Sequence, residues 1–176
     1  ATSKISRAAD LFNIEDFGFR GEALASIASV SKLAMSSKRI DADLGWELIM
    51  EGGKAISHQP KPLNVGTSVT VRDLFYNVPA RRKFLKTDRT ESRQIENIVL
   101  RLSLANLGVG FSIKGTSSKE KILLPGNSAE RLRMVLSKDF LKESIEIDEQ
   151  RGEMSLSGWV GAPGFTRRWT DQQFFY

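Results

Sequence analysis

The stretch Gly18-Phe19-Arg20-Gly21-Glu22-Ala23-Leu24 places two glycines around an arginine, directly before a run of good helix formers. Glycine adopts backbone angles that other residues avoid, and it lets a ligand approach the main chain closely. Residues 22–27 combine helix propensity with apolar Leu24 and Ile27 on one side. A glycine-rich loop leading into a helix presents unpaired N–H groups that favour phosphate. The pattern predicts either a phosphate-binding loop or an ordinary loop that caps a helix.

Two further segments carry information about the family. The chain opens with Ala1-Thr2-Ser3-Lys4-Ile5, and residues 66–85 read GTSVTVRDLFYNVPARRKFL. In this order and spacing, these segments and residues 18–30, GFRGEALASIASV, closely resemble the MutL family of DNA mismatch repair ATPases, which belongs to the GHKL superfamily. The resemblance continues more weakly to Tyr176 and is nearest to the bacterial type. Val78 stands where the family usually has threonine, and Phe17 where it has leucine, but neither position contacts a ligand in the family.

The resemblance implies an α+β fold. We expect the C-terminal portion of a two-layer α/β sandwich of the GHKL ATPase type, with its ATP lid, over residues 1–106. Part of an α/β transducer domain should follow over residues 107–176, where the composition shifts. The resemblance also implies that the catalytic glutamate, the Mg²⁺-binding asparagine and the adenine loop precede Ala1, and that the family's sequence continues beyond Tyr176.

Hydrophobic periodicity predicts the individual elements. Helices are expected over residues 6–12, 22–29, 90–104 and 129–136. Strands are expected over residues 30–36, 46–50, 54–57, 69–72, 109–114, 121–124, 144–147 and 154–160, with another beginning at 172–176. Apolar residues at helical spacing in the third helix predict a stripe that faces the core; they are Ile95, Ile98, Val99 and Leu102.

Turn residues predict how these elements connect. Gly52-Gly53 indicates a hairpin turn. Pro60 and Pro62 indicate a loop, which should hold the single histidine, His58, facing solvent. Pro79 is expected in the first turn of a helix, where its missing N–H costs nothing.

By resemblance, all three segments contribute to an ATP site. Its residues are Thr2, Ser3, Lys4, Gly18, Phe19, Arg20, Gly21, Glu22 and Thr67. Lys4 either adds a positive charge beside a phosphate or is an ordinary surface lysine. The Thr67 hydroxyl both accepts and donates, and the resemblance implies that it contacts adenine through the upstream aspartate and a water; plain β propensity is the alternative.

The resemblance also implies which chemistry the chain does not carry. Glu22 follows a glycine turn and suits the first turn of a helix, where the dipole stabilises a carboxylate. The glutamate that activates water lies upstream in the family, so we expect no catalytic residue and no metal ligand here. The expected cofactors are ATP and Mg²⁺, with the metal ligands upstream of Ala1.

Charge indicates a second ligand. The net charge is +5 and the isoelectric point about 9.6, which permits binding to a polyanion. Residues 81–93 are rich in arginine and lysine and contain only two acids. The candidate DNA-binding residues are Arg81, Arg82, Lys83, Lys86 and Arg101. Because no base-reading pattern accompanies them, we expect non-specific contact with the DNA backbone; a solvated helix face is the alternative.

Other classes of protein are excluded by composition. The chain has no run of about 18 apolar residues and no signal peptide, which argues against a membrane protein. It has no cysteine, so disulfides and thiolate metal sites are excluded. The resemblance implies a homodimer, a mismatch-recognition partner of the MutS type, and a location in the bacterial cytoplasm in association with the nucleoid.

Together these observations predict an ATP-binding and hydrolysing molecular switch. It would dimerise and bind DNA without sequence preference, and so couple mismatch recognition to downstream repair. Two alternatives stay open: a nucleic-acid-binding module without ATPase activity, and another GHKL ATPase such as a type II topoisomerase subunit. Residues 66–85 favour the MutL type over the second alternative.

Overall fold

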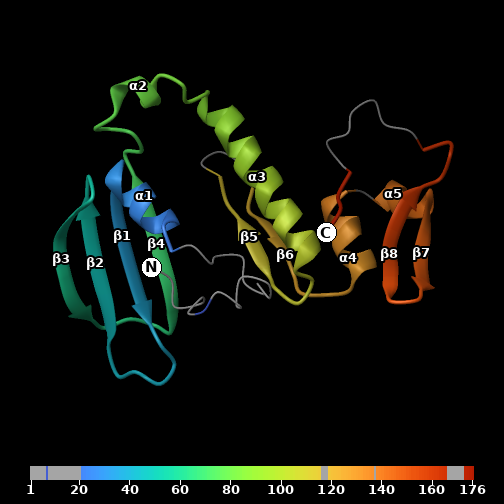
Figure 1. Ribbon diagram of the computed structural model, residues 1–176, viewed down its shortest axis with the longest axis horizontal. Coiled ribbons are helices and arrows are strands. Elements are labelled where there is room, and N and C mark those ends of the chain that lie inside the picture. Colours follow the sequence, from blue (N-terminus) through green and yellow to red (C-terminus); the bar gives the residue numbers. More distant parts are fainter. Residues whose placement is uncertain (1–6, 8–20, 116–118, 137, 166–172) are drawn as a thin grey trace. The chain divides into compact units, whose positions relative to one another are not determined.

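The computed structural model describes residue 7 and residues 21–115, 119–136, 138–165 and 173–176 (Figure 1). The chain divides into two compact units, the first ending at Leu85 and the second beginning at Lys86. Most of the helix expected over residues 6–12 lies outside the described residues. The domain boundary expected near residue 106 stays a prediction, while the compact units divide about 20 residues earlier.

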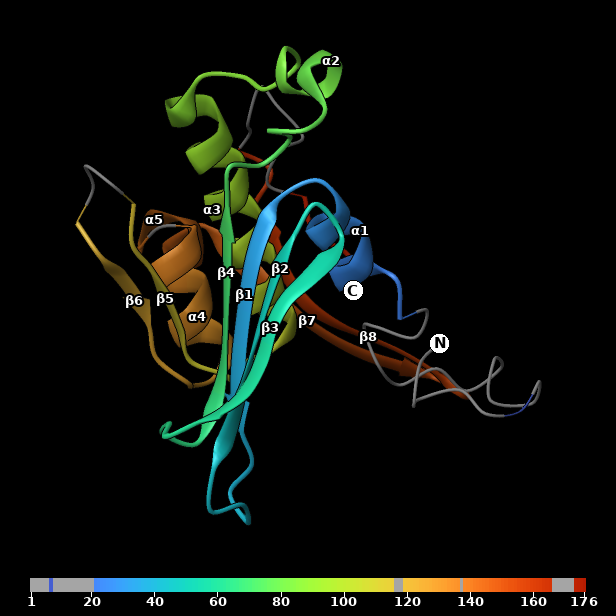
Figure 2. The ribbon, with the colours of Figure 1, turned by 90° about the vertical axis from the view of Figure 1, so that its left-hand side faces the viewer.

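The first unit is built on a four-stranded antiparallel sheet. Its strands are β1 (Lys32–Lys38), β2 (Gly45–Glu51), β3 (Lys54–Lys61) and β4 (Gly66–Arg72), in the order β3-β2-β1-β4. Helix α1 (Ala23–Ser29) lies against β1 and β2, as Figure 2 shows. Side chains alternate between the two faces of a strand. The buried core residue of β1, Leu33, therefore shares its face with Met35 and Ser37.

The predicted hairpin between β2 and β3 is confirmed. Gly52 and Gly53 form its turn, with φ of +55° and +83°. Two successive positive φ angles are the requirement of a type I′ turn, and glycine meets it without steric cost.

The loop expected at Pro60 and Pro62 is confirmed at Pro62 but was wrong at Pro60. Strand β3 continues through Lys61, so both His58 and Pro60 lie in it. Because β3 is at the edge of the described sheet, a proline that cannot donate a hydrogen bond is tolerated there. His58 is exposed as expected, but its ring lies 4.8 Å from that of Trp46 on β2. Cross-strand packing, which the local sequence does not reveal, keeps this segment extended.

Beyond β4 the chain enters a short helix, α2 (Pro79–Arg82), with Pro79 in its first turn as predicted. The second unit follows. Its elements are α3 (Asp88–Ala105), β5 (Phe111–Ile113), β6 (Lys121–Leu123), α4 (Ser128–Val135), α5 (Lys138–Lys142), β7 (Ser144–Arg151) and β8 (Met154–Gly161). Strands β5 and β6 form one antiparallel pair, and β7 and β8 form another.

Local signals account for α4 but not for every element of this unit. Asn127 and Glu130 form a capping box, in which the Asn127 side chain accepts from the Glu130 N–H at 2.9 Å. Helix α5 was not predicted, because five residues are too few to establish a period. The strand expected from residue 172 was wrong over residues 173–176, which have no regular structure.

The face of α3 that packs inward differs from the prediction. Ile95 and Ile98 are each 58% exposed, and Leu102 is 41% exposed. The buried residue of this helix is Ser103, next to the contacts with β5 and α4. Glu96 is on this side too and pairs with Lys121 of β6 at 2.6 Å. The covered side of the helix is thus displaced by about one residue position around the helix axis from the expected apolar stripe. The elements that pack against α3, and not its own apolar period, decide which side is covered.

Candidate functional site

The structure describes part of the predicted ATP site. Gly21, Glu22 and Thr67 are described and belong to the first unit. The remaining predicted residues, Thr2, Ser3, Lys4, Gly18, Phe19 and Arg20, lie outside the described residues.

Gly21 has a backbone conformation that favours glycine. Its φ is +70°, in the left-handed region, and it comes just before α1. Glu22 is the N-cap of the helix rather than its first helical residue, and its carbonyl accepts from the Ser26 N–H at 2.9 Å. A Cβ at position 21 would strain the backbone where the chain turns into α1.

Main-chain hydrogen bonds anchor the C-terminal end of α1. The hairpin turn donates from Gly53 to the Ala28 carbonyl at 2.8 Å and from Gly52 to the Ser31 carbonyl at 3.1 Å. The segment after β4 donates from the Phe75 N–H to the Val30 carbonyl at 2.7 Å. The Asn77 side chain also donates to the Ser29 carbonyl at 2.9 Å. We call these contacts the α1 junction; they hold the helix that follows Gly21 in a fixed position on the sheet.

The segment after β4 contains unusual backbone angles. Asp73 and Phe75 have positive φ, +51° and +63°, although neither is glycine. Such residues cost about 1–3 kcal/mol each and persist only where surrounding contacts hold them. The Lys32 ammonium lies 3.1 Å from the Asp73 carboxylate and 5.6 Å from the centre of the Tyr76 ring. Its hydrogen bond to Asp73 raises the pKa of Lys32 above the ordinary value.

Thr67 is the second residue of β4, and its hydroxyl has a partner that sequence reasoning missed. Thr67 pairs with Ser37 across β4 and β1, and their hydroxyl oxygens lie 2.7 Å apart. Alternation along β1 puts this pair on the face that carries Leu33. The two residues are 30 positions apart in the chain, so no local pattern joins them.

The basic candidates divide between the two units. Arg81 and Arg82 are in α2, and Lys83 follows as its C-cap. Lys86 precedes α3, and Arg101 lies near the end of that helix. All five side chains are exposed. From the helical rise, the start of α3 and Arg101 are on the order of 20 Å apart along the helix axis.

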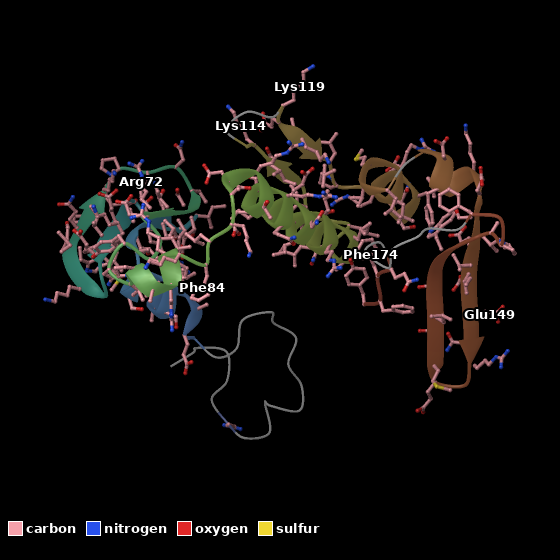
Figure 3. All side chains as sticks on the ribbon, turned by 90° about the horizontal axis from the view of Figure 1, so that it is seen from above. Arg72, Phe84, Lys114, Lys119, Glu149 and Phe174 are labelled. Atoms are coloured by element: carbon pink, nitrogen blue, oxygen red, sulfur yellow. The ribbon has the colours of Figure 1, made fainter. Side chains whose placement is uncertain are left out.

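Arg101 has contacts that the sequence did not predict. Its guanidinium lies 5.5 Å from the centre of the Phe174 ring, and its carbonyl accepts from the Tyr176 hydroxyl at 2.8 Å. Figure 3 shows Phe174 beside the end of α3. Burial raises the pKa of Tyr176. Arg101 therefore packs against the C-terminal residues, in addition to any role toward DNA.

The described residues contain no group of three or more His, Cys, Asp or Glu side chains placed to hold a metal ion. None of the helices in the described part of the chain is long and apolar enough to cross a membrane.

Curated sequences similar to this chain are DNA mismatch repair proteins. The chain is 41% identical over 181 residues to MutL of Azotobacter vinelandii and 42% identical over 178 residues to MutL of Xanthomonas campestris. Both alignments cover 100% of this chain and 28% of the relative. The chain therefore spans less than a third of the length of these relatives. No family model matches it.

Solved structures lead to the same family. The structure of the Aquifex aeolicus MutL ATPase domain complexed with ADP is 32% identical and covers 82% of this chain and 56% of that one, with a TM-score of 0.66. The N-terminal domain of a DNA repair protein, at 21% identity, shares the fold over 96% of this chain and 58% of its own, with a TM-score of 0.73. The predicted fold is thereby confirmed: a mixed α/β arrangement with an antiparallel sheet, of the GHKL type. By sequence and by structure, the chain belongs to the MutL family of DNA mismatch repair proteins.

Proposed function

We propose that this chain is part of an ATP-binding and hydrolysing molecular switch that acts in DNA mismatch repair. The observation that carries the proposal is the likeness to the Aquifex MutL ATPase domain complexed with ADP, at 32% identity over 82% of this chain. Because the chain spans 28% of its curated relatives, the activity is assigned to the complete protein. The names of the curated relatives favour mismatch repair over a topoisomerase. The likeness to the Aquifex MutL ATPase domain favours an ATPase over a binding module without that activity.

In this proposal the chain binds and orients the nucleotide. Gly21, together with the segments around Gly18 and Lys4, faces the phosphates, and Thr67 faces the base. The positive φ of Gly21 supports its role, because only a residue without Cβ adopts this conformation freely. Mg²⁺ would neutralise phosphate charge when bound. Among the described residues, no group of three or more His, Cys, Asp or Glu side chains is placed to hold a metal ion.

The same proposal includes macromolecular partners. The exposed residues Arg81, Arg82, Lys83, Lys86 and Arg101 would contact the DNA backbone without reading sequence. ATP would order the lid, since a bound γ-phosphate commonly switches a protein by ordering a segment. The ordered lid would in turn favour a homodimer. A MutS-type protein would supply the signal that a mismatch is present, and the assembly would act on the bacterial nucleoid.

The nucleotide role is tested by Gly21→Ala in the complete protein. The methyl group strains the backbone at φ +70° and narrows the approach to the main chain, so we expect ATP binding to weaken about tenfold or more, and turnover to fall. The matched control is Gly152→Ala, since Gly152 has a φ of +61° and open space around its Cβ position. Isothermal titration calorimetry measures ATP binding, and a steady-state ATPase assay measures turnover.

Two outcomes would contradict the assignment of Gly21. One is unchanged binding and hydrolysis in Gly21→Ala. The other is a loss of activity that merely follows the loss of thermal stability and is matched by Gly152→Ala. In either case the glycine would serve only the turn into α1.

A further inference from the structure

The hydroxyl pair of Ser37 and Thr67 lies at the end of an apolar row on the sheet. The pair lies on the sheet face that also carries Leu33 and Met35, and its oxygens are 2.7 Å apart. Apolar residues otherwise follow along this face, since Met35 is opposite Val69 in the register of β1 and β4. The surroundings of this sheet face therefore change from apolar to polar at Ser37 and Thr67.

The pair is also accessible. Thr67 is exposed, and Ser37 is half-buried. Gly66 precedes Thr67 with a φ of +129°, and a Cβ built at Gly66 would have no atom within 4 Å. Strand β4 is the edge strand of the described sheet, so no described strand covers its outer side. A ligand can therefore approach Thr67 from the Gly66 side of the edge.

A hydroxyl next to another hydroxyl has a restricted orientation. Each hydroxyl carries one donor and two acceptor positions. The short contact occupies one hydrogen-bonding position of Thr67 and favours the χ1 rotamer that keeps it, one of the few open to a β-branched residue. Without Ser37, the Thr67 hydroxyl would rotate and bond to water in several directions.

We infer that Ser37 is a positioning residue of the nucleotide site, which holds the Thr67 hydroxyl toward the purine base of ATP. This inference rests on the proposed function, because Thr67 faces the base only in that proposal. Ser37 itself need not touch the nucleotide. The competing explanation is that the pair only stabilises the sheet, as cross-strand hydroxyl pairs do.

The experiment uses the complete protein and four single substitutions. Ser37→Ala should weaken ATP binding about three- to tenfold, the effect of losing one orienting hydrogen bond. Ser37→Thr keeps a hydroxyl and should restore binding. Thr67→Val should weaken binding at least as much as Ser37→Ala. The control is Ser36→Ala, because Ser36 pairs with Ser68 one register position away on the opposite face, and it should leave binding unchanged.

The double variant separates positioning from sheet stability. If Ser37 acts through Thr67, adding Ser37→Ala to Thr67→Val should weaken ATP binding no further, whereas independent effects would multiply. The melting temperatures of Ser37→Ala and Ser36→Ala should agree. A melting loss confined to Ser37→Ala with unchanged ATP binding would show a purely structural pair and overturn the inference.

The remaining outcomes distinguish this inference from the proposed function. If Thr67→Val binds ATP normally, the proposed role of Thr67 fails, and the inference fails with it. If Thr67→Val weakens binding but Ser37→Ala does not, or if their effects multiply, the role of Thr67 stands and the inference about Ser37 is wrong.

Discussion

At the scale of single residues, Arg131 of α4 does most to organise the second unit. It is only 1% exposed. Its guanidinium donates to the Ser103 carbonyl at 2.9 Å and to the Val109 and Leu124 carbonyls at 2.8 Å each. A fourth bond, of 3.3 Å, reaches the Leu107 carbonyl. One side chain thus satisfies carbonyl groups at the end of α3 and beside both β5 and β6, where a buried carbonyl without a partner would be costly.

We expect Arg131→Met to lower the free energy of unfolding by about 3 kcal/mol or more, because one buried and three part-buried carbonyls lose a charged donor at once. The matched control is Arg133→Met, two residues further along the same helix and exposed, which should stay within about 0.5 kcal/mol. Urea denaturation of the complete protein measures the loss, and hydrogen exchange should show it first in residues 103–110. Equal effects of the two substitutions would contradict this role of Arg131.

At the scale of elements, the α1 junction joins a helix, a hairpin turn and the strained segment after β4. Gly52 leaves little room for a side chain between the hairpin turn and the segment after β4. A Cβ at Gly52 would lie 2.9 Å from the Tyr76 hydroxyl oxygen and 3.4 Å from Nδ2 of Asn77. Its neighbour Gly53 also has a positive φ, of +83°, but a Cβ built there would meet Ser29 only at 3.4 Å. The two glycines therefore separate the effect of the turn from that of the contact.

We expect Gly53→Ala to cost about 1–2 kcal/mol, the cost of a left-handed alanine. Gly52→Ala should cost about 1–2 kcal/mol more, because the new methyl group also displaces Tyr76. Adding Tyr76→Phe to Gly52→Ala removes the crowded oxygen and should recover part of this excess. Thermal or urea denaturation of the complete protein provides the values. If Gly52→Ala and Gly53→Ala cost the same, Tyr76 does not constrain the turn.

At the scale of the whole molecule, the basic candidates belong to both compact units. Lys83 is in the first unit and Lys86 begins the second, so DNA contacts would involve residues on each side of the division. Arg101 is less suitable for a test, since it also packs against Phe174. Lys83 and Lys86 are both exposed. Unlike Arg101, neither side chain packs against an aromatic ring of the described residues.

We expect Lys83→Gln with Lys86→Gln to weaken binding of the complete protein to unrelated duplexes equally. If both lysines contact phosphates, the slope of log K against log salt should become shallower by about 1.8. ATP binding without DNA should not change. Lys54→Gln with Lys114→Gln, at two exposed lysines, controls for the loss of two positive charges. An unchanged slope would identify a solvated face, and a loss confined to one DNA sequence would point to base readout.

Much of this protein is determined locally in its sequence. The motifs at residues 18–30 and 66–85 suffice for the family, because they fix residue types at set spacings. The Gly52-Gly53 turn and Pro79 at a helix start were predictable, since each depends on the backbone angles of its own residues. The periods of α3 and α4 likewise act between residues three or four positions apart.

Only the tertiary structure decided which surfaces and partners these elements use. Ile95 and Ile98 have a helical period, but they are exposed, because the neighbours of α3 cover the side of Ser103 instead. Ser37 meets Thr67 through the register of β1 and β4 over 30 positions. Helix and strand propensity and hydrophobic period act between residues that are near in the sequence. Strand register, burial and the hydrogen bonds of buried Arg131 depend on residues that only folding brings together.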